Sequence, residues 1–215
     1  MEQFSYFNNP PKKETPENKF LKFPGHQEDV YEASINLANY LKQEKISNVM
    51  FLDNSARQAY IGLKEAWKKV AEDEPVPNIY FINPETIKFE TDFSNLETEF
   101  WSKYKNLNPA EPILLYDACI HSGSTLFSTK AFFDHLGFKD VKLGVTSPDR
   151  EFPEDVKSKI DLVCLDHRAH AGCRPFGHPD YIEESGSLIS EATHDQKSRD
   201  RAKIEHQRIK DVFTE

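Results

Sequence analysis

The sequence predicts a single α/β domain with three layers (α/β/α), in which helices cover both faces of a mostly parallel central sheet. Two observations lead to this prediction. Short apolar runs alternate with amphipathic helical patterns along the chain, and runs such as Ile113–Tyr116 lack the polar alternation of a half-exposed strand. At 215 residues the chain is long enough for one sizeable core and rather short for two.

An irregular lead-in comes before the core. Residues 8–25 carry four prolines and many charges, so we place an irregular segment at 1–28 and a single domain at 29–215. From about residue 166 onward we expect a small hood, made from the terminal segments, and a peripheral C-terminal helix.

Apolar spacing gives the elements of this domain. Helices are indicated where apolar residues recur every three or four positions, and strands where they follow one another. Ser94 and Glu97 have capping-box spacing at the start of one helix, and Gly137 is placed to end another. The expected order is a helix from Asp29 to about Ser47, a strand at Val49–Leu52, a helix through Ala59–Val70, a strand at Ile79–Ile82, a helix from Ser94 to Leu107, a strand at Ile113–Tyr116, a helix through Leu126–Leu136, and strands at Val141–Val145 and Ile160–Leu165.

Charge and cysteine content exclude several classes of protein. With 36 acidic against 27 basic residues the chain is acidic, which argues against general binding to nucleic acid or to an anionic membrane. No apolar run approaches a membrane span and no signal-peptide pattern opens the sequence, so we expect a soluble, cytoplasmic protein. Three cysteines are too few for a disulfide framework. The sequence is also compatible with a homodimer.

The strongest functional signal is ILLYDACIHSGST, Ile113 to Thr125. Ligands of parallel sheets bind beyond the carboxyl ends of the strands, where Asp117 and the following loop are expected. Small and hydroxyl residues then lead into a helix, so that backbone N–H groups and hydroxyls converge on one spot. This pattern predicts a phosphate cradle, although its spacing is that of neither a nucleotide P-loop nor a dinucleotide fingerprint. The alternative is an ordinary capped strand-to-helix turn.

The same stretch resembles the signature of the type I phosphoribosyltransferases, in which four apolar residues precede two acids and a loop ending in Thr-Gly-x-Thr. The resemblance implies a phosphoribosyltransferase-like fold, phosphoribosyl pyrophosphate as a small phosphorylated donor substrate, and Mg²⁺ held mainly by that donor. It implies that Asp117 binds the ribose hydroxyls and that Asp117 and His121 are catalytic. The 5-phosphate would be held by His121, Ser122, Gly123, Ser124 and Thr125.

A second piece of the resemblance follows the first strand. This family places its pyrophosphate-binding loop there, and the chain has Ser55, Ala56 and Arg57 at that point. An arginine can clamp a diphosphate with two parallel hydrogen bonds. The alternative for Arg57 is a solvated residue in the first turn of a helix.

Two positions depart from the family pattern. Ala118 stands where the second acid is usual, and His121 stands where some purine-handling members have an aspartate. We therefore carry three hypotheses. The first is an enzyme of nucleotide metabolism that transfers the phosphoribosyl group to a nitrogen acceptor, a nucleobase, with release of pyrophosphate. The second is a non-catalytic binding or regulatory protein on the same fold, and the third is a metal-dependent hydrolase.

The third hypothesis rests on CLDHRAHAGCRPFGH, Cys164 to His178, which gathers five soft or borderline metal ligands in a spacing unlike the standard zinc sites. The residues of this zinc alternative are Cys164, His167, His170, Cys173 and His178. Position gives another interpretation, because the segment leaves the carboxyl edge of the sheet, where an acceptor should lie. The candidate acceptor-binding residues are Asp166, His167, Arg174 and Phe176.

Overall fold

The structure is a computed structural model, and it describes residues 24–52, 56–90, 92–120, 122–148, 154–165, 182–183, 191–192 and 196–214. Five strands form one sheet, in the order β2-β1-β3-β4-β5, with every pairing parallel. They are β1 (Asn48–Leu52), β2 (Asn78–Ile82), β3 (Ile113–Ile120), β4 (Val141–Pro148) and β5 (Leu162–Val163), while β6 (Ile182–Glu183) and β7 (Glu191–Ala192) form a separate antiparallel ribbon. The helices are α1 (Pro24–Gln43), α2 (Ala56–Val70), α3 (Pro84–Lys88), α4 (Ser94–Lys103), α5 (Ser124–His135), α6 (Glu154–Lys157) and α7 (Gln196–Asp211).

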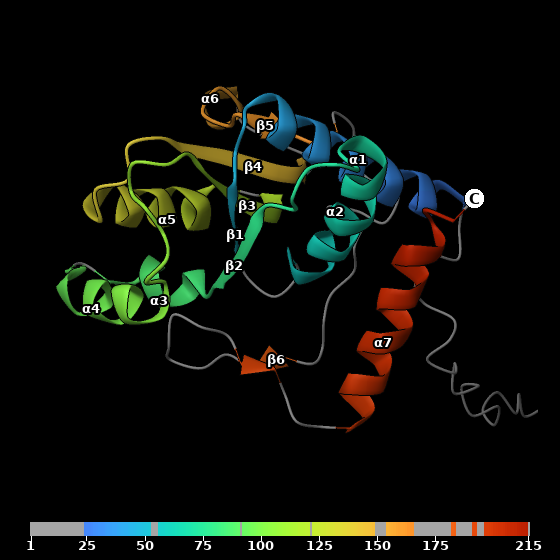
Figure 1. Cartoon of the computed structure of the whole chain (residues 1–215). Coiled ribbons are helices and arrows are strands. Elements are labelled where there is room, and N and C mark those ends of the chain that lie inside the picture. Colours follow the sequence, from blue (N-terminus) through green and yellow to red (C-terminus); the bar gives the residue numbers. More distant parts are fainter. Residues whose placement is uncertain are drawn as a thin grey trace, which may run out of the picture.

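Helices cover both faces of the sheet, which confirms the predicted three-layer α/β fold (Figure 1). Alternate residues of β1 serve the two layers because side chains alternate along a strand. Val49 and Phe51 pack with α1, α2 and the end of α7, whereas Met50 and Leu52 pack with α3, α4, α5 and α6. None of the described helices combines the length and apolar character needed to cross a bilayer.

Two helices begin differently from the prediction. The helix expected from Asp29 starts five residues earlier, at Pro24, inside the segment predicted to be irregular. The capping box at Ser94 and Glu97 is wrong: the Asp92 carboxylate accepts hydrogen bonds from both the backbone N–H and the hydroxyl of Ser94, at 3.0 and 2.6 Å. Ser94 therefore lies inside α4, and Phe93 is its N-cap without a side-chain bond.

Helix α3 was not predicted, because five residues are too few to show helical periodicity. Its start nevertheless carries a signal. Asn83 is the N-cap, with Oδ1 accepting a hydrogen bond from Glu85 N at 3.2 Å, and Pro84 occupies the first helical position. The short α6 was also missed. By contrast, Gly137 ends α5 as predicted, at a φ of 87°.

Three strands differ in extent from the prediction. β3 runs to Ile120 and β4 runs to Pro148. The two strands continue to pair beyond the apolar residues from which they were predicted, and the last pair is Ile120 with Pro148. The last strand is shorter than the expected Ile160–Leu165, since only Leu162 and Val163 pair with β4. The helix expected within the peripheral C-terminal segment is α7, and its final turn reaches the core through the fully buried Ile209.

Candidate functional site

The order of the strands puts the switch point of the sheet, where a ligand crevice is expected, between β1 and β3. In open parallel sheets the ligand site lies outside the carboxyl ends of the strands, where the chain leaves neighbouring strands toward opposite faces. Here β1 continues into α2 on one face, and β3 continues into α5 on the other. The segments that follow β1 and β3 are those that carry the predicted pyrophosphate and phosphate loops.

Asp117 lies inside β3 rather than in a loop after it. The register pairs Phe51 with Tyr116, so Asp117 is level with Leu52, the last residue of β1. On its other side Asp117 is opposite Val145 of β4. The side chain is half-buried and engaged in an interaction within the fold. The backbone of Asp117 is therefore held between β1 and β4 near the carboxyl edge of the sheet.

The turn at Ser122–Thr125 leads from β3 into α5 and depends on glycine at its centre. Gly123 is the N-cap of α5, at a φ of 75°, in the left-handed region where glycine carries no steric cost. A side chain here would also collide, because a Cβ would lie 2.5 Å from Cε2 of Phe127. Only glycine fits this turn without strain.

The hydroxyls of the Ser122–Thr125 turn lie at the N-terminal end of α5. Ser122 Oγ accepts a hydrogen bond from Ser124 N at 3.3 Å and donates one to Ser124 Oγ at 3.2 Å, and both side chains are exposed. Thr125 is half-buried, and its carbonyl accepts a hydrogen bond from Thr129 Oγ1 at 2.9 Å. The first N–H groups of a helix carry positive potential. An anion placed at this end of α5 would meet N–H groups and two hydroxyls together.

Arg57 lies in the first turn of α2, as the alternative for this residue expected, but it is not fully solvated. It is the second residue of α2 and half-buried, with its guanidinium carbon 4.6 Å from the ring centroid of Phe81. A cation over an aromatic face is attracted to the ring. Arg57 therefore packs toward β2, at the outer edge of the sheet, with Ala56 fully buried beside it. To bind a diphosphate, the guanidinium would act from this position or leave the ring.

A buried polar cluster joins β3, β4 and the residue that follows β5. The Tyr116 hydroxyl lies 2.7 Å from Thr146 Oγ1 and 3.4 Å from Cys164 Sγ, and all three residues are at most 2% exposed. Burial raises the pKa of the Tyr116 phenol well above its ordinary value and that of the Cys164 thiol to about 12. Both groups are neutral at physiological pH, so the cluster serves as a hydrogen-bonded connection beneath the crevice.

Of the five residues in the alternative zinc site, Cys164 is the one that the structure describes. Its sulfur lies in the core, and its carbonyl accepts a hydrogen bond from Asn36 Nδ2 at 2.8 Å. A thiol with a raised pKa is a poor metal ligand, because metals bind the thiolate. A zinc site that used Cys164 would therefore require this sulfur to leave the core. Among the described residues, no group of three His, Cys, Asp or Glu side chains is placed to hold a metal ion.

Several predicted site residues lie outside the described residues. They are Ser55, His121, Asp166, His167, His170, Cys173, Arg174, Phe176 and His178. The described residues that the structure brings to the carboxyl edge are Asp117, Ser122, Gly123, Ser124 and Thr125, with Ala56 and Arg57 at the start of α2. The β6–β7 ribbon lies below the sheet in Figure 1, on the side toward which β1 and β2 run.

Two buried hydroxyls at this edge were not predicted from the sequence. Thr146 and Ser147 are fully buried near the end of β4, and Ser147 is opposite Cys119 of β3. Alternation along the strands puts Ser147 on the same face as Asp117. The available signal was the one that revealed Asp117, namely polar residues that directly follow an apolar strand pattern ending at Val145.

Comparison with known proteins gives matches at the level of structure. No family model matches the chain, and no curated protein matches it by sequence. A purine phosphoribosyltransferase from Pyrococcus horikoshii superposes with a TM-score of 0.36 at 15% identity, over 57% of this chain and 74% of that one. A hypoxanthine-guanine phosphoribosyltransferase from Bacillus anthracis gives 0.40 at 14% identity, over 67% and 76%. A hypoxanthine phosphoribosyltransferase from Trypanosoma cruzi, solved with its product IMP, gives 0.43 at 14% identity, over 66% and 76%.

Proposed function

We propose that this chain binds phosphoribosyl pyrophosphate with Mg²⁺ at the carboxyl edge of its sheet. We further propose that it transfers the phosphoribosyl group to a nitrogen acceptor, a nucleobase, with release of pyrophosphate. The observation that supports the proposal is that Asp117 lies near the carboxyl end of β3, and that the Ser122–Thr125 turn leads from the same strand into α5. A carboxylate for ribose hydroxyls and a helix N-terminus for a phosphate are the two groups that a phosphorylated ribose requires.

The proposed reaction breaks the bond between C1 of the ribose and the pyrophosphate oxygen, forms a bond from C1 to the acceptor nitrogen, and releases the proton of that nitrogen. The Ser122–Thr125 turn would hold the 5-phosphate, and Asp117 would accept hydrogen bonds from the ribose hydroxyls. Both contacts orient C1 toward the acceptor, which is the main source of rate acceleration in a reaction of this kind. The Asp117 carboxylate also stabilises positive charge that develops on the ribose.

The oxygen donors at this edge suit Mg²⁺. Hard cations prefer carboxylate and hydroxyl oxygen, which Asp117 and the two serines of the turn provide. Bound Mg²⁺ would supply charge neutralisation on the leaving pyrophosphate, and most of its ligands would come from the donor. The net charge of −9 supports a small-molecule ligand over nucleic acid, and we place the protein in the cytoplasm.

A non-catalytic binding protein is the second candidate, and Ala118 favours it. This residue stands where the family usually has its second acid, and its side chain is 1% exposed. By alternation with Tyr116 it faces α2 rather than the face of Asp117. Position 118 therefore offers the crevice no polar group.

Pyrophosphate release separates the two candidates. The purified chain would be given Mg²⁺, phosphoribosyl pyrophosphate and a panel of purine and pyrimidine bases, with binding of the donor followed in parallel. Turnover with any base supports the enzyme, whereas Mg²⁺-dependent binding without turnover supports the binding protein. Asp117→Asn should weaken donor binding about tenfold or more through loss of a charged hydrogen-bond acceptor. Asp73→Asn removes an exposed carboxylate in the turn after α2 and should change nothing. Equal effects of the two variants would contradict the proposal.

A further inference from the structure

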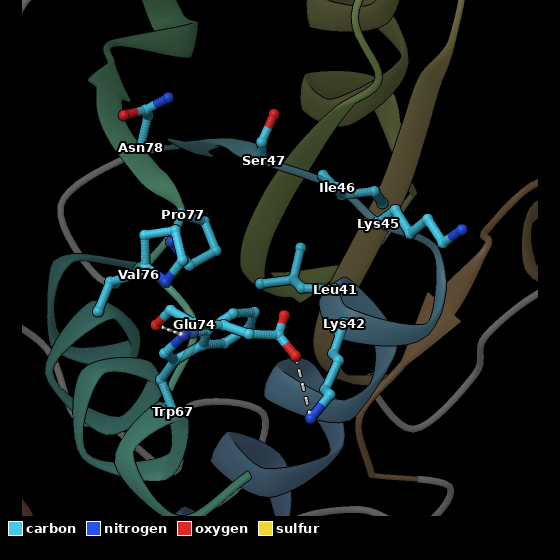
Figure 2. Close-up of a pocket in the computed structure, with 11 residues that line it drawn as sticks. Leu41, Lys42, Lys45, Ile46, Ser47, Trp67, Glu74, Val76, Pro77 and Asn78 are labelled. Atoms are coloured by element: carbon cyan, nitrogen blue, oxygen red, sulfur yellow. Dashed lines mark hydrogen bonds and ion pairs between the residues drawn. The ribbon is translucent and has the colours of Figure 1, made fainter. Parts of the chain in front are cut away.

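A hollow lies at the opposite edge of the sheet from the candidate site. It has a volume of about 320 Å³, which is within the usual range for small-molecule sites. It lies where α1 and α2 end and where β1 and β2 begin (Figure 2). Because the strands are parallel, this amino edge and the carboxyl edge are separated by the length of β1. The hollow is therefore a feature independent of the Ser122–Thr125 turn.

The floor of the hollow is apolar and rigid. Leu41, Ile46 and Trp67 line it and are each at most 5% exposed, and Pro77 is buried beside them. The Trp67 ring is held in place by a hydrogen bond from Nε1 to the Glu74 carbonyl at 3.1 Å. A floor of this kind removes an apolar group of a ligand from water without reorganising the protein.

The rim of the hollow carries one more positive than negative charge. Two lysines, Lys42 and Lys45, line it together with a single carboxylate, Glu74. Lys42 Nζ lies 3.2 Å from Glu74 Oε1 and donates a hydrogen bond to the Val70 carbonyl at 2.9 Å, as the dashed line to Glu74 marks in Figure 2. An ammonium has three donors, so Lys42 has a third to offer.

Lys45 provides the excess charge. Its side chain points away from the centre of the hollow in Figure 2, and nothing in the described part of the chain forms an ion pair or hydrogen bond with its ammonium. A lysine reaches several ångströms by rotation about its stem bonds. An anion in the hollow would therefore meet one fixed ammonium and one free to close over it.

The backbone of Lys45 is unusual. It has a φ of 54° and is the only residue other than glycine with a positive φ in the described ranges. It occupies the glycine position of a Schellman motif, in which Ile46 N donates to the Leu41 carbonyl at 2.9 Å and Lys45 N to that of Lys42 at 3.3 Å.

Helix α5 ends in the same motif with glycine. Gly137 has a φ of 87°, and Phe138 N donates to the Phe133 carbonyl at 3.1 Å. Lysine thus occupies position 45 although glycine would be less strained there. Strain of this kind at a non-glycine residue is a reason to look for a function of its side chain.

We propose that this hollow is a binding site for a small organic monoanion with an apolar body, such as an aryl or alkyl carboxylate. The body packs on Leu41, Ile46 and Trp67. The carboxylate binds the free donor of Lys42 and the ammonium of Lys45, which neutralises the excess charge of the rim. This site is separate from the proposed donor site, and its test does not depend on that proposal.

Trp67 offers a direct readout because the chain has two tryptophans, and the other, Trp101, lies in the α4 layer. In a Trp101→Phe background, 4-phenylbutyrate would be titrated while Trp67 fluorescence is followed. A saturable change is expected. 4-Phenylbutanol, which has the same body without the charge, should bind at least about tenfold more weakly.

Three variants test the role of the charge. Lys45→Gly removes the ammonium and relaxes the strained backbone, so the protein stays folded while phenylbutyrate binding weakens about tenfold. Lys45→Arg keeps the charge and should retain binding. Lys105→Ala removes an exposed charge in the turn after α4 and is the matched control. No saturable change, equal binding of the alcohol, or wild-type affinity in Lys45→Gly would each overturn the proposal.

Discussion

Gly123→Ala tests the geometry of the Ser122–Thr125 turn. An alanine at a φ of 75° is strained by about 1–2 kcal/mol. Its Cβ would also stand 2.5 Å from Phe127 Cε2, so the phenyl ring must leave its rotamer at a cost of about 0.5–1.5 kcal/mol. Together these effects predict a loss of about 2–3 kcal/mol in the free energy of unfolding.

A double-mutant cycle separates the two contributions. Phe127→Ala removes the ring, so in the double variant only the backbone strain remains. The two substitutions should therefore be less destabilising together than the sum of the single losses, by about 1 kcal/mol. The assay is urea unfolding of the four proteins, followed by circular dichroism. Additive losses, or a Gly123→Ala protein as stable as the wild type, would refute the described turn.

Three further predictions concern the strands beneath the crevice. Tyr116→Phe and Thr146→Val should each lower the free energy of unfolding in urea by about 1–3 kcal/mol, because each leaves a buried hydroxyl without its 2.7 Å partner. The double variant should lose less than the sum of the two single losses, and additive losses would contradict the hydrogen bond. Burial raises the pKa of Cys164 from near 9 to about 12, so between pH 9 and 10 the unfolded state releases a proton that the folded state keeps. Stability should then fall with rising pH at up to about 1.4 kcal/mol per pH unit, and less steeply in Cys164→Ala; equal slopes would show the thiol to be accessible. Ala118→Asp places a carboxylate at a 1% exposed position, where burial raises the pKa of that carboxylate. The variant should therefore be several kcal/mol less stable than the wild type at pH 8 and should regain stability toward pH 5. Ala118→Asn, which does not titrate, should show no such recovery.

The layered fold was predictable because each strand of the five-stranded sheet and most helices show their own apolar pattern, whereas the two-residue strands β6 and β7 show none. The length of β3 could not be predicted from the sequence. Asp117, Ala118 and Cys119 have no apolar periodicity, and their strand conformation comes from pairing with β4. Short elements were also lost, since α3 contains little more than one helical turn.

The candidate site was predictable in the same uneven way. The Ser122–Thr125 turn is local in sequence, and its glycine and hydroxyls could be recognised directly. The stacking of Arg57 on Phe81 joins two elements that the linear chain does not relate. The Tyr116 hydroxyl bonds partners 30 and 48 residues away, so its cluster became visible only in the folded chain.

Calorimetric titration of phosphoribosyl pyrophosphate into the purified chain, with and without Mg²⁺, tests the proposed donor site most directly. We predict saturable binding that requires Mg²⁺ and is abolished by Ser124→Asp, since that substitution puts a like charge at the N-terminal end of α5, in the proposed phosphate site. Absence of binding under both conditions, or unchanged affinity in Ser124→Asp, would contradict the assignment.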